Sequence, residues 1–466
     1  MTTRKQFLQR SAAVALASGG FYELLDTLAP SPARAATRAT AALPPEQHLL
    51  RNVRVVHESG IEVVIPPRHH QLVTARLATG RTPASLREAQ HTLEQALGEL
   101  DREFPATPSG LGLTVGWGLP YFRRFVPAQW KRHAPRNLAT KGDAVLDARR
   151  FPSDPAYTIL EANDVILQFR SDRLDHIAAA SKLILAKTHG ILDVTSIRRG
   201  FVGGPVDGGV GLPKQMALKA GIPAASRIPD AAPLFLGFTS SQRAALGPDL
   251  IANFETLPGL TDQWPDGYFR EGTTMHVSHL YLDLSNWYDN FSFTDRVWAT
   301  FTPDLDAPDG TITVPEGSDQ VADFTRINDD VSLHGFTGHS ASMQPATRLQ
   351  ADVRSNHGTV YPKGTALIQR PDFDTLDSPF AWTSNVIRDR WSRYPSAGVH
   401  FVAYAPTTDT FNRARLAMDG RYTNGTVLPA DPTQPSRQFN SVLEATHRQN
   451  FLVPPRRHRS FPLAEL

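Results

Sequence analysis

Alternation of apolar and polar residues recurs through the first half of the chain and predicts half-buried strands. These strands are expected over Ile61–Ile65, Gln71–Leu77, Leu111–Gly118 and Asp164–Phe169. Apolar side chains at helical spacing predict helices over Thr82–Phe104 and from Leu174 to about His189. The order strand, helix, strand, strand, helix is typical of an α+β unit whose helices pack on one face of an antiparallel sheet.

A similar order of elements returns in the second half. Strands are predicted over Thr273–Leu282 and Gly398–Tyr404, a short helical stretch over Leu284–Tyr288, and a helix over Thr410–Met418. The pattern favours a duplicated unit with halves at residues 49–240 and 241–466. Two independent domains that share the same strand-helix order are the alternative.

The N-terminus has the organisation of a targeting segment. A charged start is followed by a weakly apolar run and by small residues typical of a cleavage site, which predicts an export signal over residues 1–35 and a linker over 36–48. The segment resembles a twin-arginine signal with Lys5 in place of the second arginine, so we expect a periplasmic or extracellular protein. A general secretory signal or an uncleaved helix is the alternative. No later apolar run reaches the roughly 20 residues of a membrane span.

Composition narrows the chemistry. A chain of 466 residues with 41% hydrophobic residues is long enough to bury a large core. Because there are no cysteines, disulfides, thiolate nucleophiles and iron–sulfur clusters are excluded. The 48 basic residues nearly balance the 46 acidic ones, so charge gives no reason to expect a nucleic-acid partner.

The segment Val331–Phe380 concentrates imidazole and guanidinium groups among Gly, Pro, Ser and Thr. These groups belong to His334, His339, His357, Arg348, Arg354 and Arg370. Such side chains in a loop-rich segment favour a ligand site, although solvated surface groups would give the same composition.

A second candidate is the glycine-rich segment Arg199–Pro213. It contains neither a Walker loop nor a dinucleotide fingerprint. Its one carboxylate is Asp207, in the sequence Gly204-Pro-Val-Asp207-Gly208. In isolation, a Gly-x-x-Asp-Gly sequence is most often a turn.

Taken in order, several such landmarks resemble the dye-decolourising (DyP-type) haem peroxidases. The landmarks are Gly204-x-x-Asp207-Gly208, Pro233–Phe238, Glu271–Trp287, His339 with Pro345 six residues later, Ile368-Gln-Arg370, Gly398–Met418 and Asn450–Pro455. The resemblance covers most of the chain after the export signal.

The resemblance implies a fold and a site. It implies an α+β fold of two ferredoxin-like halves, with antiparallel sheets and helices outside. It further implies that haem b is bound by His339 as proximal ligand, with Gly204, Gly208 and Arg354 also at the cofactor, and that Asp207 and Arg370 act on hydrogen peroxide. An organic electron donor would be oxidised.

Other interpretations of the same residues stay open. If Phe201-Val-Gly203-Gly is the true equivalent of the family's motif, the distal acid is missing. His357 is a rival iron ligand because it stands nearer to Arg370 along the chain. Two other functions remain: a haem-free DyP-like binding protein, and a mononuclear metal site formed by His334, His339 and His357. The sequence leaves a homo-oligomer open.

Overall fold

The computed structural model describes residues 43–204, 209–239, 251–306, 313–378, 395–428 and 439–466. The predicted export signal, Asp207 and Gly208 lie outside these residues. The segment expected as a linker is buried at its end, where the Gln47 side chain donates a hydrogen bond of 2.7 Å to the Pro454 carbonyl. The packed chain therefore begins before residue 49.

The first half contains the predicted strands and helices. Its strands are β1 (Arg54–Glu58), β2 (Ile61–Ile65), β3 (His69–Leu77), β4 (Gly112–Gly118), β5 (Arg136–Asn137), β6 (Gly142–Asp143), β7 (Ile159–Leu160), β8 (Val165–Ser171) and β9 (Leu192–Phe201). Its helices are α2 (Pro83–Glu103), α3 (Leu119–Phe125), α4 (Pro127–His133), α5 (Leu174–Lys187), α6 (Leu212–Lys219) and the 3₁₀ turn η1 (Ala225–Arg227).

The second half repeats the mixture with shorter helices. Its strands are β10 (Thr273–Leu282), β11 (Val353–Arg354), β12 (Val360–Tyr361), β13 (Phe373–Thr375), β14 (Gly398–Ala405) and β15 (Leu443–Val453). Its helices are the π turn η2 (Asn286–Asn290), α7 (Phe293–Thr300), α8 (Phe324–His334), α9 (His339–Thr347), α10 (Thr408–Met418) and the 3₁₀ turns η4 (Phe439–Ser441) and η5 (Arg456–His458).

Helix α2 shows how the sequence specifies an element. The Thr82 hydroxyl accepts a hydrogen bond of 3.2 Å from the backbone N–H of Ser85, and Pro83 stands in the first turn, where it needs no backbone donor. Leu93 and Leu97, four residues apart, lie on one face and are fully buried. The helix ends at Phe104, whose extended backbone turns the chain toward β4.

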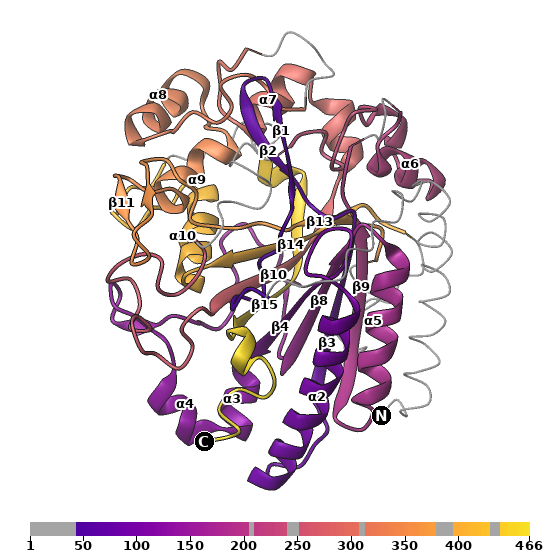
Figure 1. The fold of residues 1–466 in the computed structure, drawn as a ribbon. Coiled ribbons are helices and arrows are strands. Elements are labelled where there is room, and N and C mark those ends of the chain that lie inside the picture. Colours follow the sequence, from indigo (N-terminus) through magenta and orange to yellow (C-terminus); the bar gives the residue numbers. More distant parts are fainter. Residues whose placement is uncertain (1–42, 205–208, 240–250, 307–312, 379–394, 429–438) are drawn as a thin grey trace.

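The large sheet closes into a ring (Figure 1). Around the ring, in order, are β10, β14, β13, β9, β3, β8, β4 and β15, and β15 pairs with β10 again. His279 on β10 consequently has His400 of β14 on one side and His447 of β15 on the other. Backbone pairing therefore joins the two halves of the chain at β9–β13 and at β4–β15.

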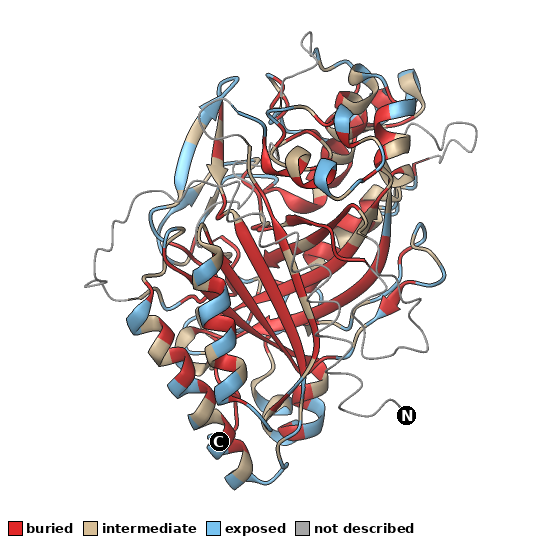
Figure 2. Ribbon diagram, turned by 90° about the vertical axis from the view of Figure 1, so that its right-hand side faces the viewer, coloured by how far each residue is buried: buried red, intermediate tan, exposed pale blue. Residues whose placement is uncertain are grey.

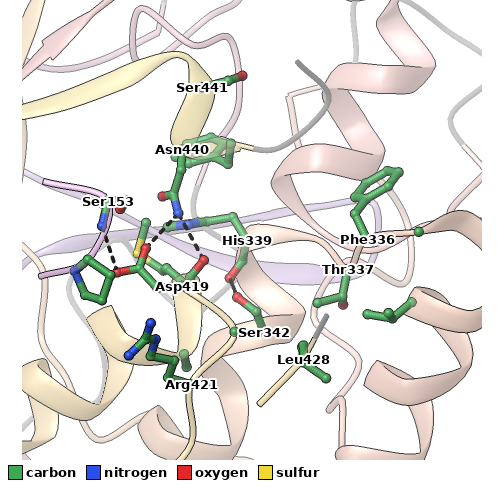
Figure 3. Close-up of a pocket in the computed structure, with 17 residues that line it drawn as sticks. Ser153, Phe336, Thr337, His339, Ser342, Asp419, Arg421, Leu428, Asn440 and Ser441 are labelled. Atoms are coloured by element: carbon green, nitrogen blue, oxygen red, sulfur yellow. Dashed lines mark hydrogen bonds between the residues drawn. The ribbon is translucent and has the colours of Figure 1, made fainter. Parts of the chain in front are cut away.

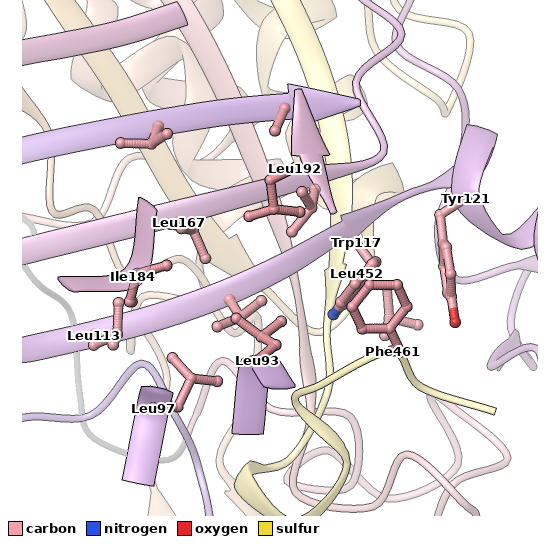
Figure 4. Close-up of a cluster of buried hydrophobic side chains, with 14 of the residues drawn as sticks. Leu93, Leu97, Leu113, Trp117, Tyr121, Leu167, Ile184, Leu192, Leu452 and Phe461 are labelled. Atoms are coloured by element: carbon pink, nitrogen blue, oxygen red, sulfur yellow. The ribbon is translucent and has the colours of Figure 1, made fainter. Parts of the chain in front are cut away.

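Both faces of the ring are buried, as the strands in Figure 2 show. Outside the first half, α2 and α5 cover an apolar core that includes Leu93, Leu97, Leu167 and Ile184 (Figure 4). Burying each such side chain stabilises the fold by about 1.5–3 kcal/mol. Outside the second half, a separate cluster around Trp287 packs beneath the shorter helices.

The structure confirms the predicted α+β class, with antiparallel sheets and helices outside. Val331–Phe380 is loop-rich, as predicted, but the end of α8 and all of α9 also lie within it. His339 is thus the first residue of a helix.

Candidate functional site

His339 owes its position to Gly338, which stands just before α9. A Cβ at Gly338 would lie 2.2 Å from the Phe301 carbonyl oxygen, so no larger side chain fits there without displacement. The same carbonyl accepts a hydrogen bond from the Ala341 N–H at 3.1 Å. This contact with the end of α7 fixes where α9 starts and where its first side chain points.

His339 borders a largely apolar cavity of about 170 Å³ between the second half of the sheet and the helices α9 and α10. Its apolar wall includes Leu280, Leu282, Val399, Phe401, Met343 and Met418. The lining side chains with an imidazole, carboxyl or guanidinium group are His339, Arg370, Asp372, Asp374, Arg415 and Arg448. Two predicted site residues, His339 and Arg370, are therefore brought to one cavity.

The His339 ring is electrically neutral. Burial removes the hydration of the charged imidazolium, and the nearby Arg370 and Arg415 charges add to this, so the pKa of His339 is lowered to about 3. Its Nδ1 atom is buried without a hydrogen-bond partner. The ring of Phe439 stacks on it at 4.2 Å between centroids. A neutral imidazole is the form that ligates a metal.

Beside Arg370, two carboxyl groups face the same cavity. Burial raises the pKa of Asp372 to about 6, although the Arg370 charge acts in the opposite direction. The Asp372 Oδ1 atom is buried without a partner. Asp374 is fully buried on β13, and its Oδ2 accepts a hydrogen bond of 2.7 Å from the Phe235 N–H. Burial raises the pKa of Asp374 well above its usual value.

The two other arginines at the cavity are held by acids. Arg415 and Arg448 both bind the buried carboxylate of Asp154, at 3.3 and 2.6 Å. Arg415 also pairs with Asp419 at 2.8 Å. Arg448 donates a further hydrogen bond of 3.1 Å to the Ser278 hydroxyl on β10. These links hold both guanidinium groups in place at one side of the cavity, beside the Asp154 and Asp419 carboxylates.

A second cavity, of about 430 Å³, lies on the other side of His339 (Figure 3). His339, Met418 and Phe439 line both cavities and so form the wall between them. The second cavity is more polar, because Asp419 faces it and accepts hydrogen bonds from the Ser153 N–H and the Asn440 amide. His339 therefore has an apolar space on one side and a polar one on the other.

Two other predicted site residues, Arg354 and His357, are not brought to this cavity. Arg354 and His357 lie on the exposed hairpin of β11 and β12, where Arg354 donates to the Gly358 carbonyl at 3.0 Å. The His357 ring contacts the edge of Trp264. Both side chains face solvent because the hairpin projects from the surface instead of packing on the sheet.

In the glycine-rich segment, the described residues end at Gly204. Asp207 and Gly208 lie outside them, so their positions stay predictions. Gly203 has a φ of 129°, and open space surrounds the position of its missing Cβ. Gly204 lies against the Ala231 carbonyl.

The predicted mononuclear metal site is not formed. His334 pairs with Asp304 at 2.9 Å on the surface side of α8, and His357 is on the hairpin. Among the described residues, no group of three or more His, Asp or Glu side chains is arranged to hold a metal ion. Nor does any helix in these ranges have the length and apolar character needed to cross a membrane.

Comparison with known proteins places the chain in a family. A family model described as a family of unknown function (DUF7405) matches residues 67–455. The chain belongs to this family. No curated protein matches it.

Solved structures with a similar fold are DyP-type peroxidases. The enzyme from Cellulomonas bogoriensis is 18% identical, with 89% of this chain and 96% of that chain covered and a TM-score of 0.50. The encapsulated DyP-type peroxidase of Mycobacterium smegmatis is 14% identical, with 85% and 96% covered and a TM-score of 0.49. At such identity, the likeness to the Cellulomonas protein shows a common fold and nothing more.

Sequence reasoning missed Asp372, Asp374 and Arg415 as cavity residues. Asp372 and Asp374 alternate with apolar residues in Arg370-Pro-Asp372-Phe-Asp374. This alternation is a strand signal that places both carboxylates on the same face as Arg370. Arg415 gave no comparable signal, because the helical pattern alone did not reveal which face of α10 meets the cavity.

Proposed function

We propose that this member of the DUF7405 family is an exported haem-dependent peroxidase that reduces hydrogen peroxide and oxidises an organic donor. The observation that carries the proposal is the position of His339. It is a neutral imidazole at the wall of an apolar cavity, with a buried and unpartnered nitrogen, and it shares the cavity with a permanently charged arginine.

The residues present fit haem in their chemistry. A histidine nitrogen is a common axial ligand, and the Leu, Val, Phe and Met side chains of the cavity suit a flat apolar macrocycle. Arg415 and Arg448 provide fixed positive charge for the carboxylates at its edge. When bound, haem supplies the two electrons that break the O–O bond of hydrogen peroxide, and an organic donor later replaces them.

The protein's own residues do three things in this proposal. Met343 and Phe401 exclude water, which strengthens electrostatic interactions within the cavity. Arg370 stabilises the negative charge that develops on the departing peroxide oxygen, because its guanidinium stays ionised. His339 holds the cofactor from the start of α9, where Gly338 fixes its position.

A second candidate is a haem-free binding protein with the same scaffold. Two observations favour a protein without haem. The Phe439 ring already stacks on the His339 ring at 4.2 Å between centroids and so occupies one face of this imidazole. The apolar cavity, at about 170 Å³, is smaller than the roughly 300–1,000 Å³ usual for ligand pockets.

The deciding experiment is reconstitution with haemin, followed by absorption spectroscopy. We expect the wild-type chain to give a Soret band at one haem per chain and to oxidise a dye when peroxide is added. His339→Ala is expected to lose the bound haem, whereas His357→Ala, at the exposed hairpin, is expected to retain it. Circular dichroism establishes that each variant is folded. A folded wild-type protein that takes up no haem would exclude the peroxidase and leave the binding protein.

A further inference from the structure

The sequence offers two registers for the family's distal motif, one with Asp207 as the acid and one in which the acid is missing. If the segment Phe201–Gly204 is the equivalent of the family's distal motif, glycine stands at 203 where the resemblance implies an aspartate. Gly203 has no side chain with which to transfer a proton. Peroxide heterolysis needs a group that takes a proton from one oxygen and delivers it to the other.

A different carboxylate lies in the cavity itself. Asp372 and Arg370 both line the cavity and stand two residues apart, and the Arg370 charge acts on the Asp372 carboxylate. The Asp372 side chain is only half-buried, so part of it is open to the cavity, yet its Oδ1 atom is buried without a hydrogen-bond partner. An unpartnered buried oxygen costs free energy unless a bound group supplies the missing hydrogen bond.

The neighbouring Asp374 does not offer the same chemistry. It is fully buried, and one of its oxygens is committed to the backbone N–H of Phe235. That hydrogen bond ties the β13 segment to the loop that contains Phe235. Its Oδ1 atom is buried without a partner, as in Asp372, but the Asp374 side chain is fully buried and therefore less open to a ligand in the cavity than Asp372 is.

We propose that Asp372 is the proton-transfer residue of this chain and replaces the acid that Gly203 lacks. The inference rests on the proposed peroxidase function. The Asp372 carboxylate takes a proton from one oxygen of hydrogen peroxide and returns it to the other, which leaves as water. The carboxylate is regenerated, so no net proton is gained or lost by the protein.

The ionisation of Asp372 is compatible with this role. Burial raises its pKa to about 6, so the carboxylate is mostly ionised at pH 7 and mostly protonated at pH 5. His339 faces the same cavity but is neutral throughout this range, because its pKa is about 3. Burial raises the pKa of Asp374 well above its usual value and so favours its protonated form. Asp372 is consequently the cavity group expected to change charge near pH 6.

The chain provides a matched control in Asp377. Burial raises the pKa of this carboxyl to about 6 as well. It lies beside His400, with Oδ2 3.8 Å from Nε2, and is not among the residues that line the cavity. Asp377→Asn removes a carboxyl group with a similar pKa from a fully buried position outside the cavity.

The test compares haem-reconstituted wild type, Asp372→Asn, Asp372→Glu and Asp377→Asn by stopped-flow mixing with hydrogen peroxide between pH 4.5 and 8. We expect Asp372→Asn to keep its Soret band but to react about 10²- to 10⁴-fold more slowly, the usual contribution of a positioned acid-base group. In wild type, the rate of reaction with hydrogen peroxide should fall tenfold per pH unit below about pH 6. In Asp372→Asn, this decrease at low pH should be absent. Asp372→Glu should recover part of the rate, and Asp377→Asn should behave as wild type.

A readout independent of activity is infrared titration of the haem-free chain. We expect carboxylic acid C=O absorption that disappears as the pH rises through 6, with one part lost in Asp372→Asn and another part lost in Asp377→Asn. A normal peroxide rate and an unchanged pH dependence in haem-loaded Asp372→Asn would overturn the role of Asp372 while the peroxidase stands. Titrating absorption that is the same in wild type and Asp372→Asn would also overturn it. A wild-type chain that binds no haem would overturn both proposals.

Discussion

Gly200 stands where the two halves of the molecule pack closely against each other at the pairing of β9 with β13. A Cβ at this position of β9 would lie 2.0 Å from the Asp374 carbonyl oxygen and 2.4 Å from the Phe373 ring. The pairing of β9 with β13 depends on this contact, because it is made through Phe201 and Asp374. A single glycine therefore permits the pairing of β9 with β13, which also positions the Asp372 and Asp374 carboxylates at the cavity.

We predict that Gly200→Ala destabilises the fold by about 1–3 kcal/mol, the usual cost of overpacking a close contact. Urea denaturation followed by circular dichroism measures this change. Gly98→Ala is the matched control, because Gly98 lies within α2 and an added Cβ there would meet only Arg102 Nη1 at 3.5 Å. Helix propensity predicts that this control is stabilised by about 0.5–1 kcal/mol. Equal stability of the two variants would show that the β9–β13 contact can accommodate an added side chain.

Part of the site could be predicted from single residues, and part could not. His339 and Arg370 were identified because their neighbours resemble a known order of landmarks, and both reach the cavity. Arg354 was expected at the cofactor from the resemblance, and His357 was considered because it stands nearer to Arg370 along the chain; the structure leaves both on an exposed hairpin. Asp372 was missed because its significance lies in burial and an unpartnered oxygen. Neither property has a sequence signature of its own.

At the scale of elements, α9 explains why the second half was harder to predict than the first. Its sequence, HSASMQPAT, has an interior proline and no apolar periodicity, so local propensity does not favour a helix. Packing against α10 and the end of α7 stabilises it instead. The helix α2, with its cap and its regular leucines, was by contrast predicted almost to the residue.

The start of α9 also yields a prediction. Gly338→Ala is expected to displace the first turn of the helix, because the new Cβ would collide with the Phe301 carbonyl oxygen. His339 would move with it, so haem affinity should fall at least tenfold while the fold persists, as a misplaced ligand implies. Titration with haemin measures the affinity. Ser332→Ala, at an exposed position of α8, serves as control. Unchanged affinity in Gly338→Ala would show that His339 is placed by other contacts.

At the scale of the whole molecule, buried histidines determine how stability depends on pH. Burial lowers the pKa of His48, His70 and His339 to about 3 and of His69 and His447 to about 4, and places those of His276, His279 and His400 well below the usual value. In the unfolded chain, each regains a pKa of about 6.5. Below that pH the unfolded chain binds protons that the folded chain does not, so acid favours unfolding.

Buried carboxyls act in the opposite direction. Burial raises the pKa of Asp372 and Asp377 to about 6 and that of Glu255 to about 7, and it raises that of Asp374 further. Their contribution to stability is complete below about pH 4 and is lost as the pH rises through the folded pKa. Because the buried histidines outnumber these acids, the net effect between pH 6.5 and 5 is a loss of stability on acidification.

We therefore predict that the free energy of unfolding falls as the pH is lowered from 7 to 5. Each buried histidine whose effect is not balanced by a buried carboxyl lowers the free energy of unfolding by up to about 1.4 kcal/mol per pH unit of acidification. Both ring nitrogens of His48 are buried without partners in the folded chain, so only the unfolded chain protonates this ring readily. His48→Gln should therefore reduce the slope of the unfolding free energy against pH by the equivalent of about one proton. His357→Gln, at the surface, should leave the slope unchanged. Urea denaturation at pH 7, 6 and 5 measures the slope, and a flat profile would contradict the prediction.

The closure of the sheet into a ring could not be predicted from the sequence. Alternation identified five of the eight strands of the ring, namely β3, β4, β8, β10 and β14. It contains no information on which strand pairs with which across hundreds of residues. That β10 has β14 on one side and β15 on the other follows from tertiary packing. The α+β class could accordingly be predicted, whereas the closed ring of strands could not.

The closed ring has a consequence for how this chain is made. The ring has no complete circuit until β15 is available, because this strand joins β4 of the first half to β10 of the second. While residues 443–453 are still within the ribosome, β4 and β10 each present an unpaired edge, to which other chains can add. The final closure joins segments more than 300 residues apart, which makes it slow. Nascent chains should consequently depend on chaperones until synthesis has passed β15.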